Sequence, residues 1–173
     1  MKTALPNPSG PVFELNPDLM AKGIEASRES PRRRMILPIH REQDALVQRM
    51  LNFFQPGTYV QPHIHPRESA SETIYMIQGK LGFLTFTEAG AIEQSCELKA
   101  GGLIDIEPDI CHGMICLAPD TVILEVKRGP YDAAGDKTFA EWAPSENSAE
   151  EASRFLAKLE ARFQRKIQQE TNS

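Results

Sequence analysis

The chain has 173 residues, a length that fits one domain. Its 19 basic and 24 acidic side chains give a net charge of −5, which argues against a protein that binds duplex nucleic acid through a basic face. No stretch approaches the ~18 apolar residues that span a bilayer, and the N-terminus lacks the apolar run of a signal peptide. Three cysteines without a CxxC pair are typical of reduced thiols. These features predict a soluble cytoplasmic protein with neither a nucleic acid nor a membrane as partner.

Residues 1–30 are expected to form an N-terminal arm followed by a short helix. Asn16 is a favourable N-cap, and Pro17 suits the first turn of a helix. Pro31 cannot continue a helix, so the helix should end before it.

The segment 31–144 is expected to form the main β domain, because short apolar runs alternate there with turn residues. Strands are expected at residues 46–54, 59–65, 72–78, 80–87, 91–98, 103–107, 112–117 and 121–127. Short strands at this spacing, separated by Gly, Pro and Asp, favour a sandwich or a small barrel. Gly79 marks a turn between two of them.

The segment 145–173 is predicted to be an amphipathic helix. Ser148 and Glu151 form a capping box at its start. An apolar stripe then recurs at steps of three or four residues, at Ala152, Leu156, Leu159, Phe163 and Ile167. We expect this stripe to pack against the β domain, and it is also suited to a contact in a homodimer.

Three of the four histidines lie in strand contexts that suit a metal ion. His63 and His65 are two residues apart, so both side chains leave the same face of a strand. Glu72 opens the next strand at the end of an apolar row, and His112 opens a later one. One histidine in a strand is more often structural than a metal ligand. The spacing between the four residues is therefore stronger evidence for a metal site than the residue types alone. Three imidazoles and one carboxylate suit Fe, Mn, Ni, Zn, Co or Cu.

The spacing of these residues resembles a known family. From Gly57 to Gly79 the chain reads G-x5-H-x-H-x6-E-x6-G, and Gly101 and His112 follow in the order of a second motif. The pattern is similar to the two motifs of the cupin superfamily, whose fold is an all-β jelly-roll barrel, or double-stranded β-helix. The resemblance implies that one divalent transition metal is held inside the barrel by His63, His65, Glu72 and His112.

The carboxylate ligand has an alternative. Six residues separate His65 from Glu72, where the cupin motif has three or four, and Glu68 lies inside this longer gap. We favour Glu72, because its distance to Gly79 matches the family motif and its position in the strand turns it inward.

Further blocks over roughly residues 25–146 resemble the WbuC-type cupin metalloproteins. These blocks include VQRMLNFFQPGTYVQPHIHP and, in family order, KRGPYD, DK and FAEWAP. That bacterial family is associated with surface-polysaccharide gene clusters. The resemblance implies a small polar ligand or substrate, such as a sugar or a polysaccharide precursor. It leaves open a metal-dependent enzyme of the dioxygenase, isomerase or lyase type and a non-catalytic cupin that binds or senses a ligand.

Three further residues are candidates for lining the pocket. Arg49 shares its predicted strand face with Val47, Leu51 and Phe53, so it either binds an anionic group inside the barrel or lies at the rim. Tyr59 and Gln61 share the face of His63 and His65 by alternation. The spacing identifies no catalytic acid or base.

Overall fold

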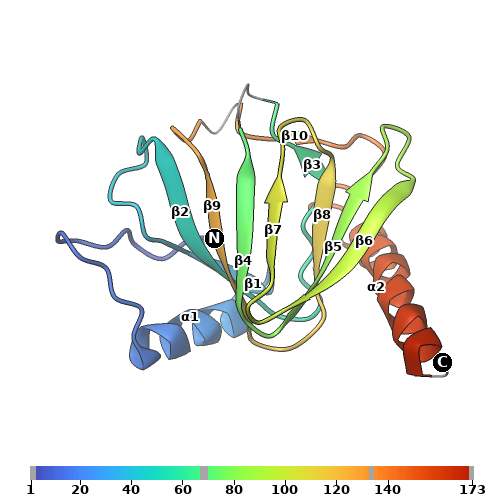
Figure 1. Ribbon diagram of the computed structural model, residues 1–173, viewed down its shortest axis with the longest axis horizontal. Coiled ribbons are helices and arrows are strands. Elements are labelled where there is room, and N and C mark those ends of the chain that lie inside the picture. The colour runs from blue at the N-terminus through green and yellow to red at the C-terminus, as the bar shows by residue number, and fades with distance from the viewer. Residues whose placement is uncertain (1–2, 67–69, 133–134, 172–173) are drawn as a thin grey trace.

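Two five-stranded antiparallel sheets face each other in the computed structural model, which describes residues 3–66, 70–132 and 135–171, with side chains up to residue 164 (Figure 1). Sheet A has the order β1 (Arg34–Pro38), β2 (Val47–Phe54), β9 (Thr121–Arg128), β4 (Glu72–Gln78), β7 (Leu103–Ile106). Sheet B has the order β10 (Thr138–Phe139), β3 (His63–Ile64), β8 (His112–Cys116), β5 (Lys80–Phe86), β6 (Ile92–Lys99). The predicted all-β jelly-roll barrel is therefore confirmed.

The strands differ from the sequence-based expectation at the barrel edges. The expected strand at 59–65 is paired only at His63–Ile64, and the rest of it is irregular. Two edge strands, β1 and β10, were not expected. β10 has only two residues, which is too short for an alternation of apolar and polar residues to be visible.

The barrel interior is apolar over most of its length. One buried cluster fills the space between the sheets, and it comprises Phe54, Ile74, Met76, Leu81, Phe83, Leu98, Ile106, Met114, Cys116 and Ile123. Along β4, Glu72, Ile74 and Met76 alternate inward and are at most 2% exposed. The apolar row of β4 thus ends in a buried carboxylate, as the sequence predicted.

Gly79 joins β4 of sheet A to β5 of sheet B. Its backbone has φ +83°, a left-handed conformation that glycine adopts without steric cost. A Cβ at this position would also meet the hydroxyl oxygen of Thr121. The glycine therefore allows the chain to pass from one sheet to the other in a single tight turn.

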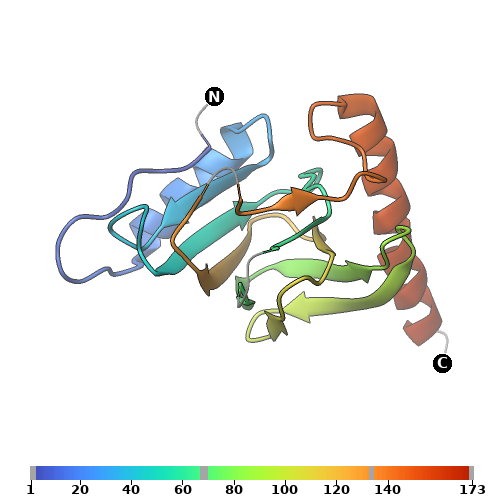
Figure 2. The ribbon, with the colours of Figure 1, turned by 90° about the horizontal axis from the view of Figure 1, so that it is seen from above.

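Two helices cover the outer faces of the sheets (Figures 1 and 2). Helix α1 (Pro17–Glu29) begins where the Asn16 side chain accepts a hydrogen bond of 2.9 Å from the Leu19 N–H, and it packs on sheet A beside Leu51 and Phe53. Helix α2 (Ala149–Thr171) packs on sheet B. Neither helix, within the residues described, has an apolar stretch long enough to cross a membrane.

The apolar stripe of α2 packs against the barrel as expected. Ala152, Leu156, Leu159 and Phe163 are all below 9% exposed and contact Leu84, Phe86 and Ile115 of sheet B. The side chain of Ile167, the last residue of the predicted stripe, lies outside the described residues. The aromatic ring of Phe163 lies over Gly82 of β5, where a Cβ would approach the ring to 2.7 Å.

Substituting Gly82 by Ala should therefore lower the free energy of unfolding by about 1–3 kcal/mol, the usual cost of overpacking a core. Urea denaturation of the two proteins measures the difference. In a Phe163→Ala background the same substitution should cost clearly less, because the clash is removed. An equal cost in both backgrounds would show that the close approach of α2 is not what constrains Gly82.

Candidate metal centre

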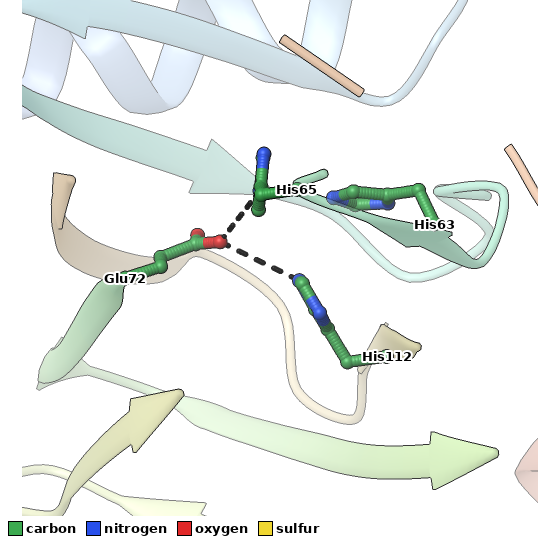
Figure 3. A group of neighbouring side chains, drawn as sticks. All are labelled: His63, His65, Glu72 and His112. Carbon is green, nitrogen blue, oxygen red and sulfur yellow. Dashed lines mark hydrogen bonds and ion pairs between the residues drawn. The ribbon is translucent and has the colours of Figure 1, made fainter. Parts of the chain in front are cut away.

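Four side chains with metal-binding atoms converge at one end of the barrel (Figure 3). His63 begins β3, His112 begins β8, Glu72 begins β4, and His65 follows β3 directly. All four are at most 5% exposed, and their ligand atoms lie within 4.8 Å of one another. The structure thus brings together the four residues that the sequence singled out. Glu68, the alternative carboxylate, lies outside the described residues.

The sheet register explains why these residues meet. His63 and His112 are paired across β3 and β8, and their ring centroids are 4.6 Å apart. Glu72 comes from sheet A, so it approaches the histidines from the opposite side of the barrel (Figure 3). The site therefore links the two sheets.

Backbone carbonyls fix the tautomer of all three imidazoles. The Nδ1 atoms of His63, His65 and His112 lie 2.9, 2.6 and 2.9 Å from the carbonyl oxygens of Gln61, Asp136 and Ile110. A carbonyl oxygen can only accept, so each Nδ1 carries the hydrogen and donates it. In its neutral form a ring held in this way has its lone pair on Nε2, and that is the form in which histidine binds a metal.

The Nε2 atoms of two histidines face a carboxylate oxygen. Glu72 Oε2 lies 2.9 Å from His65 Nε2 and 3.4 Å from His112 Nε2 (Figure 3). The buried His112 Nε2 has no hydrogen bond of good geometry among the described residues. Lone pairs and a carboxylate oxygen at these distances repel one another unless a cation, either a proton or a metal ion, lies between them.

The charge states suit a metal ion. Burial acts to raise the pKa of Glu72, but its contacts with His112 and His65 hold that pKa well below the usual range, so the carboxylate is ionised. Burial, together with the charge of Lys137, lowers the pKa of His63 well below its usual range, so that ring is neutral. Bonds of about 2.1 Å would hold the donor atoms at most about 4.2 Å apart. The four residues therefore fit a transition metal if the most widely separated ligand atoms move about half an ångström closer together.

A buried ion pair lies next to the backbone carbonyl that accepts from His65. Asp136, whose carbonyl accepts from His65, also binds Lys127 Nζ through Oδ2 at 2.6 Å. Both side chains of this pair are 7% exposed. Burial acts to lower the pKa of Lys127, but the negative charges of Glu125 and Asp136 raise it on balance, so the lysine stays protonated. The pair fixes the loop segment that orients His65.

A second buried polar pair lies on the inner face of sheet A. Asn52 Nδ2 donates to Glu125 Oε2 at 2.8 Å, and both residues are below 9% exposed. Burial and the negative charge of Glu72 raise the pKa of Glu125. Asn52, Glu125, Lys127 and Asp136 were not predicted from the sequence. Glu125 and Lys127 could have been noticed, because they occupy alternate positions that continue the inward row of Ile123 in β9.

The three pocket candidates lie elsewhere. Arg49 does not point into the barrel: its side chain is exposed, on the outer face of sheet A with Leu51 and Phe53. Tyr59 lies outside the barrel under α2, where its hydroxyl donates to the Pro144 carbonyl at 2.7 Å. The Gln61 side chain donates to the carbonyls of Ala140 and Ala143. Gln61 contributes to the site through its backbone carbonyl, which accepts a hydrogen bond from His63.

Comparisons with known proteins agree with the fold. The sequence model of a family described as a domain of unknown function (DUF6016) matches residues 15–98, a range that holds His63, His65 and Glu72 but ends before His112. No curated protein matches the sequence. A Klebsiella pneumoniae protein with a double-stranded β-helix domain superposes with a TM-score of 0.55 at 17% identity, covering 77% of this chain and 99% of its own.

Two further solved structures are more distant. KdgF from Halomonas sp. has a TM-score of 0.49 and 18% identity over 61% of this chain and 86% of its own. An oxalate decarboxylase from Lactobacillus farciminis, solved as a formate complex, has a TM-score of 0.46 and 20% identity over 61% of this chain and 31% of its own. The fold of the chain is a double-stranded β-helix.

Proposed function

We propose that the chain is a metal-binding cupin in which His63, His65, Glu72 and His112 hold one divalent transition metal. The observation that carries this proposal is the set of three Nδ1 hydrogen bonds to backbone carbonyls, which leave Nε2 as the metal-binding atom of three imidazoles clustered with one buried carboxylate. The donor set of three nitrogens and one oxygen suits Fe, Mn, Ni, Zn, Co or Cu. Such an ion, when bound, supplies Lewis acidity and open positions for an oxygen ligand.

The proposed ligand is a small polar molecule. Its support is the inner face of sheet A beside the tetrad, where Asn52, Glu125 and Lys127 place polar groups in what would otherwise be apolar core. A sugar or polysaccharide precursor is the more specific expectation, and it rests on the WbuC-type resemblance of the sequence. A cytoplasmic location and a homodimer also stay predictions.

The test of metal binding is elemental analysis of protein purified without added metal. The wild type should contain about one transition-metal ion per chain, and the double variant His63→Ala/His112→Ala should contain none, because two of four ligands are removed. His40→Ala is the matched control, since His40 is the buried histidine outside the tetrad. Full occupancy in the double variant would refute the assignment.

A further inference from the structure

The interior of the barrel has an apolar and a polar end. Across sheet A, Glu72 is paired with Lys127, and Lys127 is paired with Gln48, so these three side chains form one row on the inner face. The next row holds Ile74, Glu125 and Met50. The third row holds Met76 and Ile123 of the apolar core beside Asn52, which is the polar residue of that row. The polar rows thus lie at the end of the barrel where the metal tetrad forms.

A second lysine faces this polar end from sheet B. Thr138 and Phe139 of β10 are paired with Ile64 and His63, so the register places Lys137 opposite His65. Phe139, two residues further along β10, has its ring 6.2 Å from that of His63, so the register places Lys137 on the strand face that is turned toward the histidines. Lys137 is only half-buried, and it forms no ion pair with any residue whose placement is described.

The two lysines therefore differ in what they can bind. The ammonium of Lys127 is already held by Asp136 at 2.6 Å and is almost fully buried. The ammonium of Lys137 has an approach from solvent and no carboxylate partner in the described structure. Of the two, Lys137 is the one with capacity to bind an incoming anion.

The charge balance favours an anionic ligand once a metal is bound. By formal charge, the ammonium groups of Lys127 and Lys137 balance the carboxylates of Asp136 and Glu72, and Glu125 adds at most one negative charge. A divalent ion adds two positive charges, so the loaded site has a net positive charge. A buried or half-buried excess charge is stabilised by an ion of opposite sign.

Aromatic rings beside the histidines favour an organic ion over an inorganic one. The ring of Phe139 is 6.2 Å from that of His63, although Phe139 is 48% exposed. The ring of Phe83 stacks on that of His112 at 5.9 Å. An exposed phenyl group at the edge of a charged site offers apolar contact to the carbon skeleton of a ligand.

We propose that this site binds a small organic carboxylate, with Lys137 as the residue that pairs with the carboxylate group beside the metal. The inference rests on the proposed metal function, and it replaces the sugar expected from the WbuC-type resemblance by a carboxylate as the class of ligand. Glu125 and Asn52 lie on the facing wall, where they offer hydrogen bonds to a second polar group of the same ligand.

The test uses the full chain loaded with cobalt(II), whose visible spectrum reports on its ligands. Acetate, pyruvate and malonate are titrated, with glucose and inorganic phosphate as comparison probes. The carboxylates should perturb the spectrum of the wild type more readily than glucose or phosphate does. Lys137→Met should weaken their binding roughly tenfold or more, which is the typical worth of a hydrogen bond to a charged group. Lys137→Arg should retain most of the affinity.

Two controls separate this inference from the proposed function. Lys99→Met removes an exposed lysine, 73% accessible, from β6 and should leave carboxylate affinity unchanged. Cobalt content is measured for every variant and should equal that of the wild type. A wild type that binds no cobalt would refute both proposals at that first measurement. If the wild type binds cobalt, three results would overturn the carboxylate inference alone. These are a response to glucose equal to that to the carboxylates, phosphate binding as tight as carboxylate binding, and unchanged carboxylate affinity in Lys137→Met.

Discussion

Replacing Glu72 by Gln is expected to weaken the binding of a divalent transition metal by more than about a hundredfold. Substitutions of residues that merely orient a ligand typically cost 10–100-fold in metal affinity, and Glu72 is proposed to be a ligand itself. The glutamine keeps the shape of the side chain but loses the negative charge that faces His65 and His112. Competition with a chromophoric chelator measures the affinity.

The matched control for Glu72→Gln is Glu68→Gln. Both substitutions remove one carboxylate within the seven residues that follow His65, so they differ mainly in whether the metal loses a ligand. Glu68→Gln should change the affinity by less than about threefold, well below the cost of disturbing even an orienting residue. A larger loss in Glu68→Gln than in Glu72→Gln would show that Glu68 is the ligand.

Replacing Lys127 by Met should lower the free energy of unfolding by about 3–5 kcal/mol, the usual cost of removing one partner from a buried ion pair. Asp136 would then keep a buried carboxylate with no counter-charge, and its Oδ1 already has no hydrogen-bond partner in the described structure. Urea denaturation of the metal-free protein measures the change. Metal affinity should fall as well, because Asp136 positions His65.

Two comparisons test the reason for the Lys127 effect. The double variant Lys127→Met/Asp136→Leu should be more stable than Lys127→Met alone, because no unpaired charge stays buried. Lys80→Met, which removes a partly exposed lysine 3.4 Å from Glu97, should cost at most about 1 kcal/mol. If Lys127→Met and Lys80→Met have the same small cost, the Lys127–Asp136 pair does not hold the loop.

The roles of the four tetrad residues were predicted from the resemblance to the cupin motifs, and local rules predicted which way the side chains of His63, His65 and Glu72 face. Two histidines two residues apart in extended chain share a face, and Glu72 continues the inward row of Ile74 and Met76. These rules do not depend on how the sheets are packed. His63 and His65 therefore lie side by side as expected, even though most of the expected strand 59–65 is irregular.

The sequence left open whether Arg49 faces the barrel interior or lies at the rim, because sheet A is covered on both faces. The alternation in β2 was assigned correctly, but Leu51 and Phe53 are buried under α1 and not inside the barrel. The inner face of β2 instead carries Gln48 and Asn52, both of which are at most 5% exposed. When both faces of a strand are buried, apolar alternation alone cannot tell which face lines the interior.

The support of His65 could not be predicted from local pattern. Its partner Asp136 is 71 residues away and contributes a backbone carbonyl, which every residue type possesses. Lys127 and Asp136 likewise form a pair that depends on the fold and not on a motif.

The bond between His65 and the carbonyl of Asp136 also sets an order of events during synthesis of the chain. Contacts between distant residues form late, because a long loop must close before they become favourable. A nascent chain that has emerged only as far as β7 has His63, His65 and Glu72 but neither His112 nor the carbonyl that orients His65. Such a chain offers at most a partial set of ligands. Metal uptake should therefore follow barrel closure, and the cell would load the finished protein and not the polypeptide on the ribosome.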